Sequence, residues 1–235
     1  MKKINTILAA VGALLMLSVT GANSVEFKAG VTANGMAAYA NAKETLKGSG
    51  VKTGRTTNEE AVLATSFASI FAEVSSDEMM GLGIGVSYAP EVADLAKETR
   101  HIANPNTADS GNDTDGGVQA VDAKINDLLS VYLTLPVGDN GAYVKAGYIQ
   151  ATMVTEENLA TGSKYEDIDM TGTQVGAGYE ASLGDMAFWR AEGSYQMWED
   201  VSASGSEPDG DDSTKNKIEA EMGSVTGSLS IGMKF

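Results

Sequence analysis

The last thirteen residues of the chain constrain its fold most strongly. From Gly223 to Phe235, apolar residues and glycine occupy one parity, whereas serine, threonine, glycine and lysine occupy the other. Successive side chains of a β-strand point to opposite sides, so this period of two predicts a strand with one apolar and one polar face. The strand closes on an aromatic residue, Phe235.

The opposite end of the sequence has the features of an export signal. Lys2 and Lys3 precede an apolar run over residues 7–19, and small residues follow at 21–24. This order predicts a secretory signal peptide over residues 1–24, cleaved after Ala22 or Ser24, with a retained helical anchor as the alternative. We therefore expect the mature domain to span residues 25–235.

Charge and composition narrow the class of protein. The formal net charge is −16, and removal of residues 1–24, which hold two lysines and no acids, makes it −18. Such acidity disfavours nucleic-acid binding, which needs Lys and Arg. The chain has no cysteine, so no disulfide stabilises it. The sequence contains no later apolar run long enough for a membrane-spanning helix.

Alternation recurs along the whole mature chain. It predicts eight strands, over residues 25–40, 61–75, 80–88, 129–135, 144–148, 173–182, 187–197 and 223–235. In the second strand, Phe67 and Phe71 share a side with Glu73, which indicates either a bulge or an interior filled by aromatic rings.

The predicted connections alternate between long and short. Long polar loops are expected over residues 41–60, 89–124, 152–169 and 199–219, and short turns over 75–78, 136–141 and 184–185. The second loop contains a possible amphipathic helix at 92–99. All four prolines fall at strand ends or in connections. This arrangement is typical of a closed, antiparallel up-and-down β-barrel of eight strands, or of ten if residues 89–124 contain another hairpin.

Alternation alone fits both a soluble barrel with an apolar interior and a membrane barrel with an apolar exterior. Two features favour the membrane barrel. Charged residues lie on the polar faces, where they can pair in a narrow lumen: Glu26, Lys28, Glu73, Lys145, Glu180, Arg190, Glu192 and Lys234. Aromatic residues lie near both ends of the apolar faces, as expected at two membrane interfaces: Tyr39, Tyr88 and Tyr195 at one end, and Phe27, Tyr179, Trp189 and Phe235 at the other.

With its signal peptide, the glycine-alternating strand 80–88, the hairpin 133–148 and the closing strand 228–235, the chain resembles small bacterial outer-membrane barrels of the opacity-protein and outer-membrane-protein-A transmembrane class. The resemblance implies a Gram-negative outer-membrane location, contact with lipid and lipopolysaccharide, periplasmic termini and extracellular long loops. Because the resemblance is one of architecture, it does not identify any functional residue in this chain.

Eight strands leave an interior that side chains just fill. Inward glycines at 81, 83, 85, 176, 178 and 232 are therefore expected to make room for Tyr132, Arg190 and Lys145. We predict a plugged polar lumen in which Arg190 pairs with Glu180 or Glu192.

The sequence offers little catalytic or metal-binding chemistry. The single histidine, His101, lies in a predicted loop without a nearby serine, so we predict no catalytic site and no enzyme. Asp113–Gly116 and the acids around Gly210 resemble fragments of calcium loops, but they lack the required glutamate. We predict no resident metal or cofactor, and at most weak divalent-cation binding.

Function is expected to lie in the loops. The last three carry net charges of −4, −4 and −5, which makes one rim strongly acidic. A structural or surface-interaction role through four long extracellular loops is therefore the favoured prediction. The alternative is a narrow porin-like channel for small solutes or apolar molecules, marked by a ligand that fits the barrel wall.

Overall fold

The computed structural model describes residues 25–45, 56–102, 117–158, 167–204 and 217–235. Apart from one short 3-10 helix, η1 (Asp77–Met79), the described elements are strands. They are β1 (Val25–Thr45), β2 (Thr56–Ser76), β3 (Leu82–Ile102), β4 (Gly117–Pro136), β5 (Ala142–Asn158), β6 (Ile168–Leu183), β7 (Ala187–Trp198), β8 (Val201–Ser204) and β9 (Lys217–Lys234).

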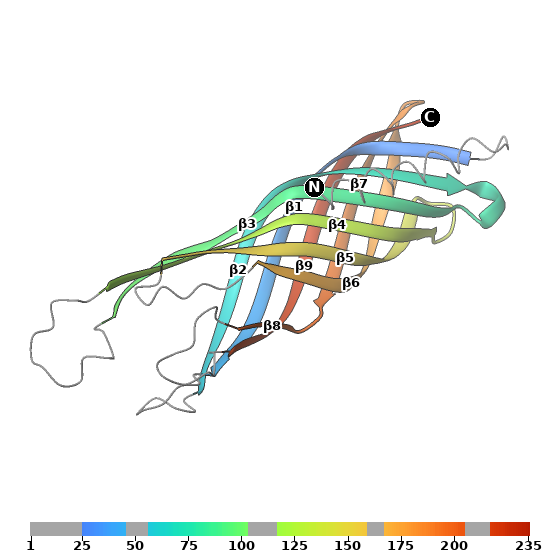
Figure 1. The fold of residues 1–235 in the computed structure, drawn as a ribbon. Coiled ribbons are helices and arrows are strands. Elements are labelled where there is room, and N and C mark those ends of the chain that lie inside the picture. The colour runs from blue at the N-terminus through green and yellow to red at the C-terminus, as the bar shows by residue number, and fades with distance from the viewer. Residues whose placement is uncertain (1–24, 46–55, 103–116, 159–166, 205–216) are drawn as a thin grey trace, which may run out of the picture.

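The strands form one closed antiparallel barrel (Figure 1). From β1 to β7 each strand pairs with the next in sequence, β7 pairs with β9, and β9 pairs with β1, which closes the wall. The short strand β8 pairs with β9 beyond the end of β7. Strands β7 and β8 therefore count together as one of the eight strands of the barrel. The predicted eight-stranded, up-and-down barrel is confirmed.

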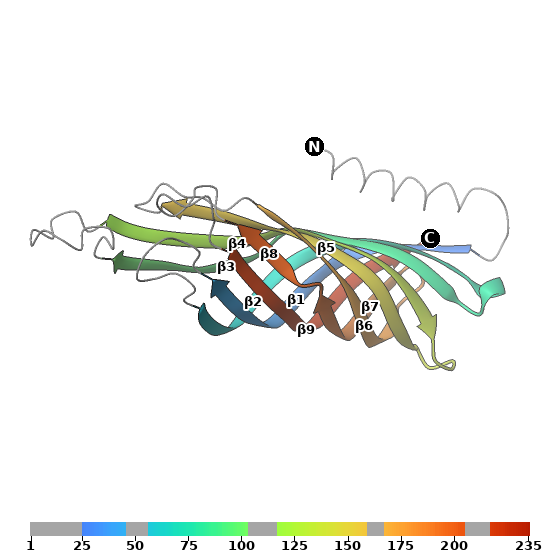
Figure 2. The same ribbon diagram turned by 60° about the horizontal axis from the view of Figure 1, so that its bottom comes forward.

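Several strands run further than the alternation predicted. Both β3 and β4 extend deep into the expected loop 89–124, and Figures 1 and 2 show this hairpin reaching past its neighbours. The prediction of a helix at 92–99 was wrong, because this segment is part of β3 and pairs with β4. The ten-stranded alternative was also wrong, because the described residues of 89–124 extend β3 and β4 and add no further strand pair to the barrel. Beyond the membrane both faces of a strand meet water, so pairing persists where alternation has stopped.

The apolar faces point outward. Leu133, Val131 and Ile84 share the outer face with the exposed side chains of the other strands. These include Val31, Ile70, Leu135, Val144, Val175, Val225, Leu229 and Ile231. So large an exposed apolar surface is stable in lipid and not in water. Among the described residues, no helix is both long and apolar enough to cross a membrane.

Both aromatic groups lie where the sequence predicted. Near the short turns, the rings of Phe27 and Phe235 lie 6.1 Å apart, and those of Tyr179 and Trp189 lie 5.8 Å apart. At the other end, the hydroxyl groups of Tyr39 and Tyr195 are hydrogen-bonded at 3.0 Å. We call the outward surface between these two groups the lipid-facing belt.

The ambiguous second strand has an aromatic interior, which was one of the two expectations. Phe71 and Glu73 are both buried in the lumen, whereas Ile70, which immediately precedes Phe71, is 60% exposed on the outer face. No register shift interrupts the pairing of β2 with β1.

Candidate functional site: an apolar chamber above a charged plug

A charged plug fills the lumen near the short turns. Of the eight charged residues predicted to face inward, six form one connected set of ion pairs, and Lys145 and Glu192 form a separate pair. Their N–O distances are 2.6 Å for Arg190–Glu180, 2.9 Å for Arg190–Glu73, 2.9 Å for Lys28–Glu180, 2.8 Å for Lys145–Glu192, 3.1 Å for Lys28–Glu26 and 3.9 Å for Lys234–Glu26, with Lys28–Glu73 at 4.0 Å. Lys145 and Glu192 form the one pair in this group without a direct ionic link to the rest.

Arg190 lies at the centre of the plug. The predicted pairing with Glu180 is confirmed, whereas Glu192 instead binds Lys145. The principal partner, Glu73, was not predicted: it accepts two parallel hydrogen bonds from the guanidinium and is only 2% exposed. Aromatic rings surround the same guanidinium, each with its centre 5.3 Å away: Phe71, Tyr143 and Phe188.

Inward glycines make room for aromatic rings of the plug, and of the three side chains predicted to use this space, Tyr132 is the one found nearest to such a glycine. The ring of Tyr132 covers Gly85, that of Tyr143 covers Gly178, and that of Phe188 covers Gly232. In each case a Cβ atom on the glycine would lie within 2.5 Å of the ring. The prediction was wrong for Gly81, which lies in the turn before β3 with φ of 74°.

Two separate sets of hydrogen-bonded polar side chains line the lumen above the plug. Asn34 donates to Ser69 at 3.0 Å and accepts from Ser228 at 2.7 Å, which joins β1, β2 and β9. Gln174 donates to Ser130, which joins β6 and β4. Polar side chains therefore continue above the plug.

The loop end of the lumen has the opposite character. Buried apolar side chains from β1, β3, β4, β5, β6 and β8 form one cluster: Met36, Ala89, Val92, Ala93, Leu128, Ile149, Ala151, Met170 and Val201. Leu63, Phe67 and Trp198 are among the partly buried residues that pack against it. We call the part of the lumen that these packed side chains fill the apolar chamber. The sequence analysis missed it because inward positions of β1 and β5 change from polar to apolar only above Asn34 and Gly147.

The wall beside the apolar chamber is split between β2 and β3. These strands pair only between Ile70–Ser76 and Leu82–Tyr88, whereas β1 and β2 pair along their full described length. Beyond the pair of Ile70 with Tyr88, β2 and β3 have no backbone pairing with each other. We call this unpaired region, residues 56–69 of β2 and 89–102 of β3, the seam. Figures 1 and 2 show the two ribbons separating there.

Side chains span the lower part of the seam. The Thr65 hydroxyl group donates to the backbone oxygen of Val92 at 3.0 Å. Leu63 and Phe67 pack on the cluster that contains Val92. Pro90 was expected at a strand end or in a connection, but it lies within β3. Proline has no N–H group to donate to a backbone ladder. The lower part of the seam is therefore bridged by side chains, which part more easily than a backbone ladder.

The remaining sequence-predicted positions form no further site where the structure describes them. His101 lies in β3, and its side chain is outside the described residues. So are the aspartates at 109, 113, 115, 209, 211 and 212. Glu180 and Glu192 belong to ion pairs, as predicted. In the part of the chain that the structure describes, no three His, Asp or Glu side chains are placed to hold a metal ion.

A closed antiparallel barrel with an apolar exterior and a charged lumen defines the protein as an outer-membrane β-barrel. The outer membrane protein OprG from Pseudomonas aeruginosa has the same fold, with a TM-score of 0.51 and 14% identity over 92% of this chain and 98% of its own. This confirms the resemblance to small outer-membrane barrels.

Two further solved structures align with TM-scores below 0.5. The outer membrane protease OmpT from Escherichia coli aligns with a TM-score of 0.45 and 14% identity, over 89% of this chain and 97% of its own. Ail of Yersinia pestis aligns with a TM-score of 0.37 and 13% identity, over 88% of this chain and 99% of its own. No protein-family model and no curated protein matches the sequence.

Proposed function

We propose that the barrel binds small apolar molecules in the apolar chamber and passes them sideways into the membrane through the seam. The single observation that carries this proposal is the unpaired stretch of β2 between Ile70 and Val62, which crosses the loop-side part of the lipid-facing belt. Val62, the partner of Tyr39 at the edge of the belt, is 83% exposed. Unpaired backbone groups in lipid are costly, so an open ladder at this depth indicates a functional opening.

The lining of the apolar chamber defines the ligand class. Met36, Leu128, Ile149 and Met170 offer methyl and thioether groups. Trp198 bears an indole N–H, which is already directed to the Ser224 hydroxyl group at 3.4 Å. Hydrocarbons and other molecules without strong hydrogen-bonding groups fit such a lining, because each buried CH₂ contributes about 0.8 kcal/mol.

The charged plug favours a sideways route over an axial one. An apolar molecule moving toward the short turns would have to displace the ion pairs of Arg190, Glu73 and Glu180. Separating buried charges costs several kcal/mol, on the order of 3–5 when one partner is lost. Parting Leu63 and Phe67 from Val92 and Ala93 breaks no backbone ladder.

The orientation and processing of the chain belong to the same proposal. We infer that residues 1–24 are removed as a signal peptide, that the short turns and Phe235 face the periplasm, and that the apolar chamber opens toward the outside. The proposed activity is transfer without chemistry, so the protein is not an enzyme.

Quenching of Trp198 tests the proposal directly. The chain has two tryptophans, and replacing lipid-facing Trp189 with Phe leaves Trp198 as the single reporter. In lipid nanodiscs, 1-bromooctane is expected to quench this variant in a saturable manner. The matched control, Trp198→Phe with Trp189 retained, should show linear quenching set by lipid partitioning. Linear quenching in both variants would refute binding in the apolar chamber.

A surface-interaction role, favoured from the sequence, is the second candidate. The β3–β4 hairpin supports it, since it projects beyond its neighbours and carries the longest of the acidic connections (Figure 1). The chain positions between its strands, 103–116, lie outside the described residues. This role is tested by replacing residues 103–116 with a short Gly-Ser linker and measuring the binding of surface polysaccharide or lipopolysaccharide. The role predicts that binding is lost. Unchanged binding would show that the hairpin is not the binding site.

A further inference from the structure

One residue interrupts the regular pairing of β4 beside the seam. Asn126 pairs with Thr152 and Leu129 with Gln150, so Asp127 and Leu128 together face a single position of β5. This is a β-bulge. Asp127 has φ of 56°, a left-handed conformation that few residues other than glycine adopt, although aspartate is one of them.

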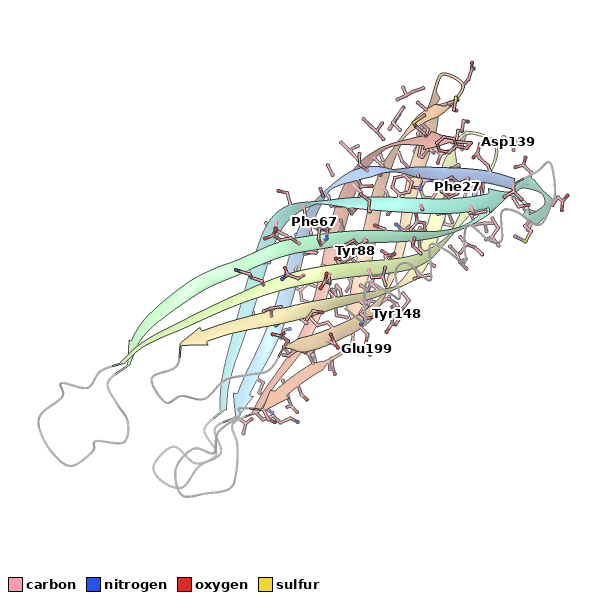
Figure 3. The ribbon with its side chains drawn as sticks, turned by 45° about the horizontal axis from the view of Figure 1, so that its top comes forward. Phe27, Phe67, Tyr88, Asp139, Tyr148 and Glu199 are labelled. Atoms are coloured by element: carbon pink, nitrogen blue, oxygen red, sulfur yellow. The ribbon has the colours of Figure 1, made fainter. Side chains whose placement is uncertain are left out.

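The bulge is hydrogen-bonded to Tyr88, the last residue of β3 that pairs with β2 before the seam. The Tyr88 hydroxyl group donates a hydrogen bond to Oδ1 of Asp127 at 2.5 Å. Tyr88 itself pairs with Ile70 on β2, and this is the final pair before the two strands separate. Figure 3 marks Tyr88 on β3 and Phe67 on β2, near the level at which the ribbons part.

A second irregularity lies immediately beyond this hydrogen bond. Between Glu91 and Ala93, β3 gains one residue relative to β4. Bulges bend a strand and increase its twist. Two of them in succession, one on each strand, therefore turn the β3–β4 hairpin away from β2 just where the seam begins.

We propose that Tyr88 and Asp127 are positioning residues that hold the seam open. Backbone groups of β2 between Val62 and Ser69 lie in the lipid-facing belt and would gain partners if β3 straightened toward them. The hydrogen bond opposes this by holding Asp127 in the bulged conformation. The consequence for transport rests on the proposed function, whereas the geometry of the seam does not.

Spin-label distances measure the seam without reference to any ligand. The chain has no native cysteine, so Ser66→Cys on β2 and Glu91→Cys on β3 place two labels across the seam on exposed side chains that lie at nearly the same level. The matched control pair is Ala37→Cys and Ala64→Cys, which are direct partners on β1 and β2. In nanodiscs, the distribution across the seam should be longer than that of the control pair.

Two variants then test the hydrogen bond. Tyr88→Phe keeps the ring but removes the donor, and it should shift the seam distribution toward the control distribution. Asp127→Asn tolerates the left-handed conformation and retains an acceptor, so its seam distribution should remain that of the parent protein. The control pair should be unchanged in both, which shows that the barrel is folded.

The outcomes separate this inference from the proposed function. An unchanged seam distribution in Tyr88→Phe, with an intact control pair, overturns the inference even if 1-bromooctane still quenches Trp198 saturably. A narrowed seam supports the inference. If the seam narrows while quenching of Trp198 is linear in the parent protein, the inference stands and the proposed function fails.

Discussion

Arg190 on β7 and Glu73 on β2 form a paired hydrogen bond across the lumen, with N–O distances of 3.0 Å and 2.9 Å. The two residues are 117 positions apart in the sequence and are 6% and 2% exposed. Planar, two-point pairing between guanidinium and carboxylate fixes both side chains, and the surrounding rings remove water from the contact. This pair connects opposite sides of the barrel.

Loss of one partner of this pair should destabilise the barrel strongly. Arg190→Ala removes the guanidinium that hydrogen-bonds both Glu73 and Glu180 and leaves Lys28 as their only shared cation, at 4.0 Å from the buried Glu73. We expect a loss of about 3–5 kcal/mol in unfolding free energy. Urea unfolding in lipid vesicles, followed by tryptophan fluorescence, measures it. Lys234→Ala, which removes a half-exposed contact at 3.9 Å, is the control and should cost less than about 1 kcal/mol. Equal effects of the two variants would contradict the role of the plug.

The rings that cover inward glycines give a second stability prediction. A Cβ on Gly178 would lie 2.4 Å from the ring of Tyr143, so Gly178→Ala should cost roughly 1–3 kcal/mol. Gly193→Ala on the outer face is the matched control, because no atom lies within 4 Å of the added Cβ. The control should be neutral or slightly stabilising in the same unfolding experiment. If Gly178→Ala behaved like the control, the packing of Tyr143 would be looser than described.

The hydrogen bond that spans the seam should regulate access to the apolar chamber. Thr65→Val preserves shape but removes the donor to Val92, so the rate at which 1-bromooctane quenches Trp198 should rise roughly 2- to 10-fold, equivalent to about 0.5–1.5 kcal/mol. Thr32→Val is the control, since Thr32 bonds Ser230 at 2.8 Å across a fully paired part of the wall. A rate increase in the control and none in Thr65→Val would argue against the seam as the route.

The charged plug should prevent steady ion flow. In planar bilayers, the purified barrel is expected to show no large, stable conductance, because Arg190, Lys28 and the aromatic rings of Tyr132 and Phe188 fill the lumen. Single-channel recording at both voltage polarities measures this. A large and persistent conductance in every preparation would require a wider lumen and favour a passive pore for polar solutes.

Divalent cations should affect the acidic connections and leave the barrel unchanged. Three of the four sequence-predicted loops carry net charges between −4 and −5, so calcium or magnesium at millimolar concentration should screen their repulsion and slow their cleavage. Limited proteolysis at matched ionic strength, with sodium chloride as the control, tests this. Identical cleavage rates would leave the acidity as a device for solubility and mutual repulsion.

Local pattern was sufficient to predict much of this protein. Alternation along β9 from Gly223 to Phe235 determined a strand with a lipid-facing side, and the positions of Glu26, Lys28, Lys145 and Arg190 on the polar faces determined a charged lumen. These are properties of one strand at a time, set by the period of two and by the cost of charge in lipid.

Only the tertiary structure decided which distant residues meet. The pairing of Arg190 with Glu73, the apolar chamber and the seam all depend on register between strands, and a single strand carries no record of its register with non-neighbouring partners. The length of the β3–β4 hairpin was also hidden, because strands that leave the membrane lose the alternation that reveals them. The bulge at Asp127 depends on the partner strands in the same way, and it directs β3 away from β2.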